Sequence, residues 1–325
     1  NPRGRLLNDD GEETGNRMTG EVELDFSASI FDLARGRVIL VFKEEAPEDY
    51  EIAPEEAYVD LFLAKLLGID ALSGFTLRAG KMRTPFGLAN RLHPHDLPHL
   101  TYAATTRAFL GDEGDLRWGG MLRGLLDASD TFAMLAEFGV YNGENEVLLA
   151  GEDSRHLSTV THLALQLELD NEGSFLYLGA SHLFGYADED AKLPTNVLAG
   201  SIKLSLAISR DTRLTVQTEV HWGLKVGEVG NVWGGYVWAQ FQADAYWTFG
   251  ARVEQTADPE DRDVKGWSVG AYMTYHAAEF LFFRVGYERY EVNELGSNLA
   301  VVETIGLQLV FILGSHPAEP FYYTR

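Results

Sequence analysis

Apolar and polar residues alternate with a period of two through most of the chain. In residues 21–30, EVELDFSASI, every second residue is Val, Leu, Phe, Ala or Ile, and the others are Glu, Asp or Ser. Successive side chains of a β-strand point to opposite faces, so this pattern indicates strands with one apolar and one polar face. The same alternation recurs in 213–222, 246–256 and 265–276. The chain is therefore expected to fold into sheets whose two faces meet different surroundings.

Fifteen segments carry a strand pattern, and many of them reach ten or more residues. Strands of soluble sheets most often have about 5–6 residues, whereas a tilted strand needs about 9–11 residues to cross a bilayer. The predicted strands are 21–30, 36–43, 56–65, 75–82, 116–126, 131–141, 158–169, 174–186, 197–208, 213–222, 232–243, 246–256, 265–276, 279–290 and 299–312.

The connections between these strands alternate in length. Turns such as 170–173 and 209–212 are short, whereas the polar connections 44–55 and 83–115 are long. Bacterial membrane barrels have tight periplasmic turns, longer outer loops and usually an even number of strands. We therefore expect one all-β domain over residues 1–325, a transmembrane antiparallel β-barrel of about sixteen strands.

The two ends of the chain do not show a clear strand pattern. Residues 1–8 could supply a sixteenth strand, although Pro2 interrupts them, and 314–325 form a C-terminal tail. The start at Asn1, without Met or a signal peptide, indicates a mature or trimmed chain.

A soluble β-sandwich or propeller also shows alternating apolar and polar residues, but the long strands and almost charge-free apolar faces favour a membrane barrel. Aromatic residues lie towards the ends of those faces, as in membrane girdles: Trp118, Phe132, Trp222, Trp247, Trp267, Tyr275 and Tyr287.

The composition excludes several classes of protein. With 49 Asp and Glu against 26 Lys and Arg, the net charge of −23 repels nucleic acid. The absence of cysteine excludes disulfides, thiolate metal sites, a cysteine nucleophile and covalent c-type haem. A hydrophobic content of 46% excludes intrinsic disorder, and no apolar run is long enough for a membrane-spanning helix. Because no P-loop or dinucleotide motif is found, we expect no enzyme activity.

The chain contains the segments GEVELDFSASIFD at 20–32, EEAYVDL at 55–61, LRAGKMRTPFGLANRLHPHD at 77–96, RAFLGDEG at 107–114 and LVFILGSHPAEPF at 309–321. Together they resemble a poorly characterised family of Gram-negative outer-membrane barrels with porin-like character. Members of that family are mostly described as hypothetical proteins, and some as TonB-receptor-like or zinc-regulated. The resemblance implies a barrel in the cell envelope and says little about the solute. The chain is too short for a TonB-type receptor with a plug and 22 strands, and it does not end on an aromatic residue as a typical porin does.

The polar strand faces predict a lumen that carries both signs of charge in nearly equal numbers. Such charges either create a field that tunes the selectivity of a water-filled pore or form ion pairs that brace a polar interior, and the sequence supports both interpretations equally. The residues assigned to the pore lumen are Glu23, Asp25, Arg78, Arg117, Arg123, Glu219, Arg252 and Arg284.

Segment 83–115 is predicted to fold into the barrel and to form its constriction. It is the third outer loop in the sixteen-strand count, and a loop of this length is seldom structureless. Its apolar residues need a packing surface, which the barrel interior offers, and Asp96 could meet Arg78, Arg117 or Arg123. Since unperturbed histidine titrates near pH 6–7, we expect a pH-dependent conductance. The predicted constriction residues are Arg83, Arg91, His93, His95, Asp96 and His99.

The same loop offers a possible ligand set for a divalent metal. His93, His95, Asp96 and His99 lie within seven residues, and neutral imidazole is a good ligand for Zn, Cu or Ni. Two prolines interrupt the segment and the spacing matches no established zinc motif. The alternative interpretation is that these side chains hydrogen-bond the folded loop to the wall. No other cofactor is expected.

The sequence therefore predicts a porin-like channel in the bacterial outer membrane. It would let small hydrophilic solutes or ions diffuse passively, in contact with outer-membrane lipid and lipopolysaccharide. The alternative is a non-enzymatic barrel that encloses or anchors a partner protein. General porins are often homotrimers, so a trimer is one expected assembly.

Overall fold

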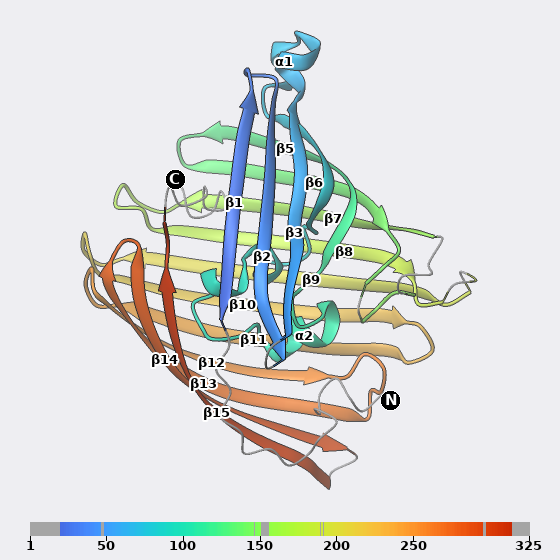
Figure 1. Cartoon of the computed structure of the whole chain (residues 1–325), viewed down its shortest axis with the longest axis vertical. Coiled ribbons are helices and arrows are strands. Elements are labelled where there is room, and N and C mark those ends of the chain that lie inside the picture. The colour runs from blue at the N-terminus through green and yellow to red at the C-terminus, as the bar shows by residue number, and fades with distance from the viewer. Residues whose placement is uncertain are drawn as a thin grey trace.

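The computed structural model describes residues 20–46, 49–145, 147–150, 156–188, 190, 192–294 and 297–313. Within these residues, fifteen strands form one antiparallel sheet, in which each strand pairs with the next along the chain (Figure 1). The strands are β1 (Glu21–Ile30), β2 (Ala34–Ala46), β3 (Asp49–Phe62), β4 (Phe75–Arg83), β5 (Leu116–Ser129), β6 (Phe132–Asn142), β7 (Leu157–Glu168), β8 (Phe175–Tyr186), β9 (Pro194–Ala207), β10 (Arg213–Val226), β11 (Gly230–Gln242), β12 (Trp247–Ala257), β13 (Val264–Ala278), β14 (Leu281–Glu294) and β15 (Ser297–Phe311).

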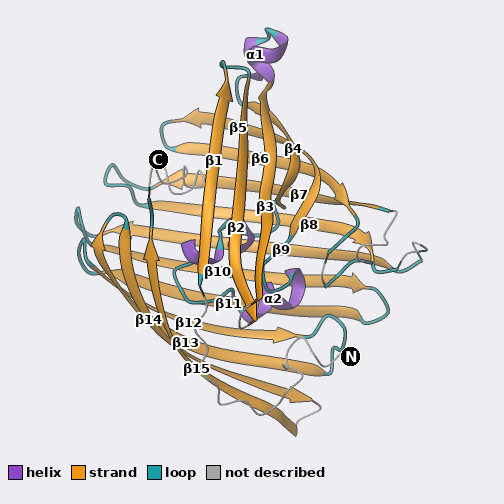
Figure 2. Ribbon diagram, viewed as in Figure 1, coloured by secondary structure: helices purple, strands orange, loops and turns teal. Residues whose placement is uncertain are grey.

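In the described part of the chain, helical structure is confined to short segments in two connections (Figure 2). They are α1 (Leu63–Leu67), α2 (Ala104–Leu110) and the 3₁₀ helices η2 (Asp70–Leu72), η3 (Ala89–Arg91) and η4 (Pro94–Asp96). Among the described residues, no helix has the length and hydrophobicity needed to cross a membrane.

The predicted all-β barrel class and the fifteen predicted strands are confirmed, with corrections around β3. The long loop expected at 44–55 is mostly strand, because β2 and β3 continue to pair as far as Ala46 and Asp49. The register shifts beside Pro54, which cannot donate a ladder hydrogen bond and is tolerated at such an irregularity. At its other end β3 stops at Phe62, and α1 follows, closed by Gly68 in the left-handed conformation at φ 67°.

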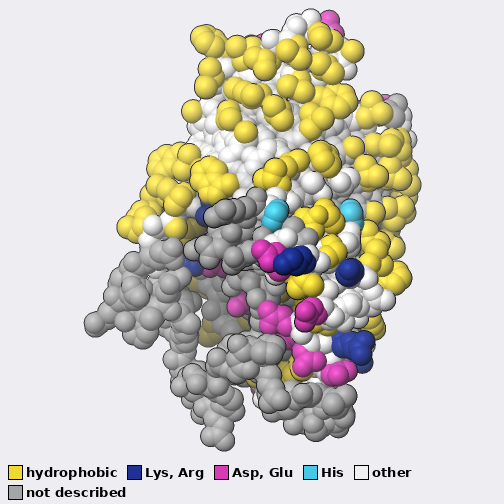
Figure 3. Space-filling view, turned by 90° about the vertical axis from the view of Figure 1, so that its right-hand side faces the viewer, with side chains coloured by type: hydrophobic (Ala, Val, Ile, Leu, Met, Phe, Trp, Pro, Cys, Tyr) yellow, Lys and Arg dark blue, Asp and Glu magenta, His cyan; other side chains and the backbone are white. Residues whose placement is uncertain are grey.

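The two faces of the wall differ as the alternation predicts. In β6, buried and exposed residues alternate along most of the strand. Outward-facing side chains such as Trp118, Leu163 and Trp222 are more than half exposed and apolar. Figure 3 shows hydrophobic side chains spread over the upper part of one face, with charged side chains gathered below them. Half of each strand thus presents a surface suited to lipid and half a surface suited to water.

The sheet curves into a barrel shape but is not closed among the described residues. β1 and β15 are the two ends of the strand order, and no pairing joins them within the described part of the chain. The sixteenth strand predicted at 1–8 and the tail predicted at 314–325 fall outside the described residues, so both stay predictions.

The connection between β4 and β5, residues 84–115, forms an inner segment that lies against the inner side of the sheet. Its side chains Phe86, Leu88, Leu97 and Phe109 are at most 1% exposed. Phe86 and Phe109 both pack edge-on against His221 of β10, with ring centroids 5.3 and 5.4 Å away. The apolar side chains of this segment therefore pack against the inner face of strands that are distant in sequence. This contact removes their apolar surface from water.

Candidate functional site

A cavity of about 2070 Å³ lies between this inner segment and the wall. Its lining comes from both ends of the sheet, with Glu21 and Glu23 on β1 and Gln308 on β15, and from the inner segment itself. Most of the side chains that line it are charged or polar, which fits a space filled with water.

Ten of the fourteen sequence-predicted residues line this cavity, and the other four are buried away from it. The lining residues are Glu23, Asp25, Arg78, Arg83, Arg91, His93, His95, Asp96, Arg123 and Arg284. Those four are His99, Arg117, Glu219 and Arg252, each at most 8% exposed. The sequence analysis assigns eight of these residues to the pore lumen and six to a constriction within it, because the part of the wall that the loop covers depends on contacts between distant parts of the chain.

Gly87 and Glu219 anchor the start of the inner segment. The Glu219 carboxylate accepts hydrogen bonds from the backbone N–H of Leu88, from Ser201 Oγ at 3.0 Å and from His221 Nε2 at 2.8 Å. Gly87 has φ +71°, and a Cβ there would lie 2.6 Å from Glu219 Oε1. Only glycine fits this approach without strain, so the carboxylate fixes the loop instead of facing the cavity.

Asp115 holds the two ends of the inner segment together. Its backbone carbonyl accepts from Thr84 N at 2.9 Å, and its N–H donates to Asn90 Oδ1 at 2.6 Å. Its carboxylate forms an ion pair with Arg117 at 2.7 Å and accepts from Asn145 Nδ2 at 2.8 Å. These buried, charge-assisted bonds hold the two ends of the loop together, and they explain why Arg117 does not reach the cavity.

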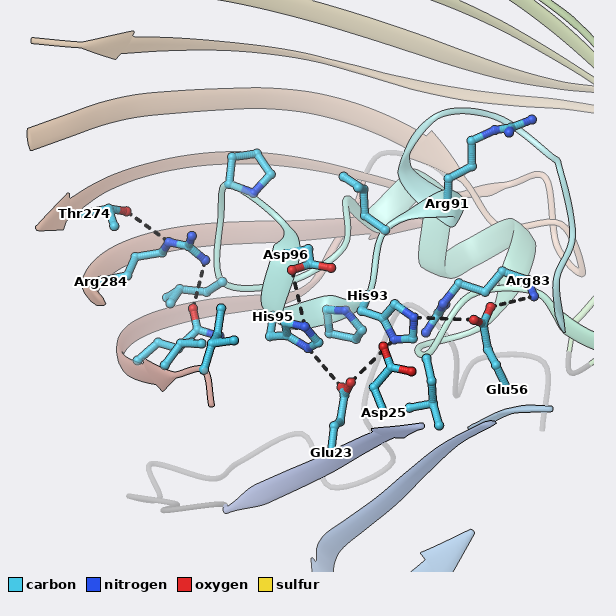
Figure 4. A pocket seen from close by; sticks show the side chains of 18 of the residues that line it. Glu23, Asp25, Glu56, Arg83, Arg91, His93, His95, Asp96, Thr274 and Arg284 are labelled. Carbon is cyan, nitrogen blue, oxygen red and sulfur yellow. Dashed lines mark hydrogen bonds and ion pairs between the residues drawn. The ribbon is translucent and has the colours of Figure 1, made fainter. Parts of the chain in front are cut away.

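His93 and His95 contact carboxylates on β1 and β3 (Figure 4). His93 Nδ1 donates to Glu55 Oε2 at 3.1 Å and lies 3.9 Å from Glu23 Oε2, while its Nε2 lies 3.9 Å from Glu56 Oε2. His95 Nδ1 lies 2.9 Å from Glu23 Oε1. The two imidazole rings stack with centroids 5.6 Å apart.

A register shift in β3 creates this arrangement. Ile39 pairs with Glu56 and Leu40 with Pro54, so Glu55 is an extra residue between two paired positions. A bulge of this kind re-aims side chains, and here two consecutive glutamates both reach His93. The sequence analysis places Glu55 at the end of the polar connection 44–55, outside the strand predicted at 56–65, and therefore does not assign it to the lumen. The sequence feature that could have indicated the bulge is Pro54, because proline within a sheet is found mainly on edge strands and at bulges.

These carboxylates control the charge of the histidines. Burial alone would lower the pKa of His93, but its contacts with Glu55 and Glu56 outweigh burial and raise the pKa to about 9. Burial also opposes the charge of His95, yet the contact with Glu23 and the nearby Asp96 raise its pKa. Both rings therefore favour the charged form more than a free histidine does.

His99 lies apart from the other two histidines. Arg252 Nη1 is 2.7 Å from its Nδ1 and donates to Thr101 O at 2.9 Å, and Arg284 Nη1 donates to the His99 carbonyl at 3.3 Å. Burial, reinforced by the charges of Arg252 and Arg284, holds the pKa of His99 well below its usual range. His93, His95, Asp96 and His99 thus do not form one ligand set in this structure, because the loop places His99 against the opposite wall.

Arginine and carboxylate side chains alternate over the wall that faces the histidines. Arg78 pairs with Asp60 at 2.7 Å and stacks over a tyrosine ring. Arg91 of the loop forms an ion pair with Glu137, which also lies 3.7 Å from Arg123. The arginines that Asp96 was expected to meet thus contact other carboxylates. Asp96 Oδ1 lies 3.3 Å from Nε2 of the neighbouring His95.

Comparisons with known proteins identify the fold. No protein-family model and no curated protein sequence matches the chain. Among solved structures, OprB of Pseudomonas putida is similar with a TM-score of 0.62 and 9% identity, over 90% of this chain and 87% of that one. The channel DcaP of Acinetobacter baumannii gives 0.57 and 9%, over 90% and 84%.

The anion-selective porin of Comamonas acidovorans is a third similar structure, with a TM-score of 0.54 and 12% identity over 90% of this chain and 88% of that one. At such identities the similarity shows the fold alone, which is that of the outer-membrane β-barrels. The expected barrel fold is therefore confirmed, whereas the TonB-receptor-like association finds no support in these structures.

Proposed function

We propose that the chain is a porin-type channel of the bacterial outer membrane, through which small hydrophilic solutes or ions diffuse passively. The observation that carries this proposal is the water-accessible cavity of about 2070 Å³ between a folded-in loop and a charged wall. The apolar outer face and the fold shared with outer-membrane channels support the membrane location. Outer-membrane lipid and lipopolysaccharide would surround the barrel, and a trimeric assembly stays a prediction.

The constriction would lie between the loop and the opposing wall. Arg83, Arg91, His93, His95 and Asp96 contribute to the lining on the loop side, and His99 would stand behind it. Selection would combine the size of the passage with the local charge of its walls, with no chemical step and no enzyme activity.

A sleeve for a partner protein is less well supported. The inner segment already packs across the interior, with Gly87 N–H donating to Ser181 Oγ of β8 at 3.0 Å. Thr105 Oγ1 likewise donates to Gln255 O of β12 at 3.3 Å. A partner inside the barrel would have to displace these contacts.

Liposome swelling tests the proposal. Liposomes that contain the refolded full chain should swell in isotonic solutions of small neutral sugars, at rates that fall with sugar size. Protein-free liposomes are the control. If barrels that migrate as folded in unheated gels give no more swelling than this control, the channel function is wrong.

A further inference from the structure

Two groups of potential metal ligands share one carboxylate in the cavity. Glu21, Glu23 and His95 offer donor atoms that all lie within 4.8 Å of one another, and so do Glu23, Glu55 and His93. These are the only such groups among the described residues, and neither includes Asp96 or His99. The ligands come from β1, from the bulge of β3 and from the loop, so the fold, not the sequence spacing, assembles them.

The two groups differ in how well their charges are already compensated. Glu55 forms an ion pair with Arg83 and accepts from His93, so a cation there would have to displace an arginine. In the first group, Glu23 Oε1 lies 2.9 Å from His95 Nδ1. This partner is an imidazole, which can lose its proton and become a metal ligand, whereas an arginine cannot.

Access also distinguishes the groups. The side chain of His95 is 27% exposed and that of His93 10%, and Glu21, Glu23 and His95 all line the cavity. An ion could reach the first group from the water-filled space and keep one or more water ligands. One imidazole nitrogen with carboxylate oxygens is a donor set that suits Zn²⁺ and related transition metals better than Mg²⁺ or Ca²⁺.

We propose that Glu21, Glu23 and His95 bind one divalent transition-metal ion inside the barrel. The ion would link the 3₁₀ turn that carries His95 to β1, and so fix the loop against the wall. It would also place positive charge in the passage. This inference goes beyond the proposed channel function, because metal binding can be measured whether or not the barrel conducts.

Calorimetric titration of the metal-free full chain with Zn²⁺ in detergent tests this site. We expect one Zn²⁺ per chain, with affinity at least tenfold weaker in Glu23→Gln and His95→Asn. His182→Asn on β8 is the matched control and should bind as the wild type does. A site lost in His93→Asn but kept in His95→Asn would overturn the assignment, as would equal affinity for Mg²⁺ or no stoichiometric binding.

A second measurement uses only the wild-type chain, so it tests the ligand set even if the variants fail to refold. X-ray absorption at the zinc edge of the loaded wild-type chain should show one imidazole ligand among oxygen ligands. Two imidazoles, or none, would contradict the proposed ligand set.

Discussion

Glu23 contacts His93 and His95, and Glu219 holds the turn that brings the loop to Glu23. One carboxylate therefore faces the cavity and the other is buried beneath the loop, although both alternate inward along their strands. The difference arises at Gly87, whose positive φ allows the backbone to approach Glu219. Single positions thus decide which charges meet water.

Gly87→Ala tests this anchor. The new Cβ would lie 2.6 Å from Glu219 Oε1 at a φ of +71°, so we expect a loss of about 1–3 kcal/mol of stability. The thermal midpoint, followed by gel mobility, should fall. Gly200→Ala is the control, because nothing lies within 4 Å of a Cβ built there. Equal midpoints for both variants would refute the anchoring role.

His93 gives a pH dependence in the metal-free protein. Its pKa is raised in the folded state to about 9, so the stabilisation from its charged form is complete below about pH 6.5 and is lost as pH rises through about 9. The thermal midpoint in EDTA should therefore fall between pH 7 and 10, and less so in His93→Asn. Identical pH profiles for the two proteins would contradict this assignment. The pH 6–7 transition expected for unperturbed histidine does not apply to His93 or His99.

The strands are the elements that the sequence predicts best, because alternation is a local property. The inner segment is harder. Its length and apolar residues indicate that it needs a packing surface, but its contacts with β8, β10 and β12 depend on distant parts of the chain. The bulge at Glu55 was missed for a related reason, since a one-residue shift is visible only in the pairing of β2 with β3.

Cysteine labelling tests the position of the loop. The chain has no cysteine, so Asp96→Cys introduces a single thiol at a residue that lines the cavity. A positively charged thiosulfonate reagent should then reduce the current through the channel. Asp112→Cys, at an exposed position, is the control and should be labelled with little effect on current. Unchanged current after complete labelling of Asp96→Cys would place this residue outside the passage.

Over the whole molecule, an apolar outer face encloses a polar interior that carries most of its charges in ion pairs. Such an interior is rigid, and its field is local because opposite charges lie side by side. In lipid, β1 and β15 would need partners for the edge backbone groups that no strand of the described residues pairs, so the sixteenth strand predicted at 1–8 matters for the closed barrel. The net charge of −23 would attract cations towards the molecule.

Single-channel conductance of the full chain, compared with a variant in which 92–101 are replaced by a short Gly-Ser linker, tests the central claim most directly. Discrete open-channel steps are expected for the wild-type chain in planar bilayers, and steps at least twofold larger for the shortened variant, because the loop narrows the passage. Wild-type barrels that are folded but silent, or equal steps in the two proteins, would contradict a channel constricted by this loop.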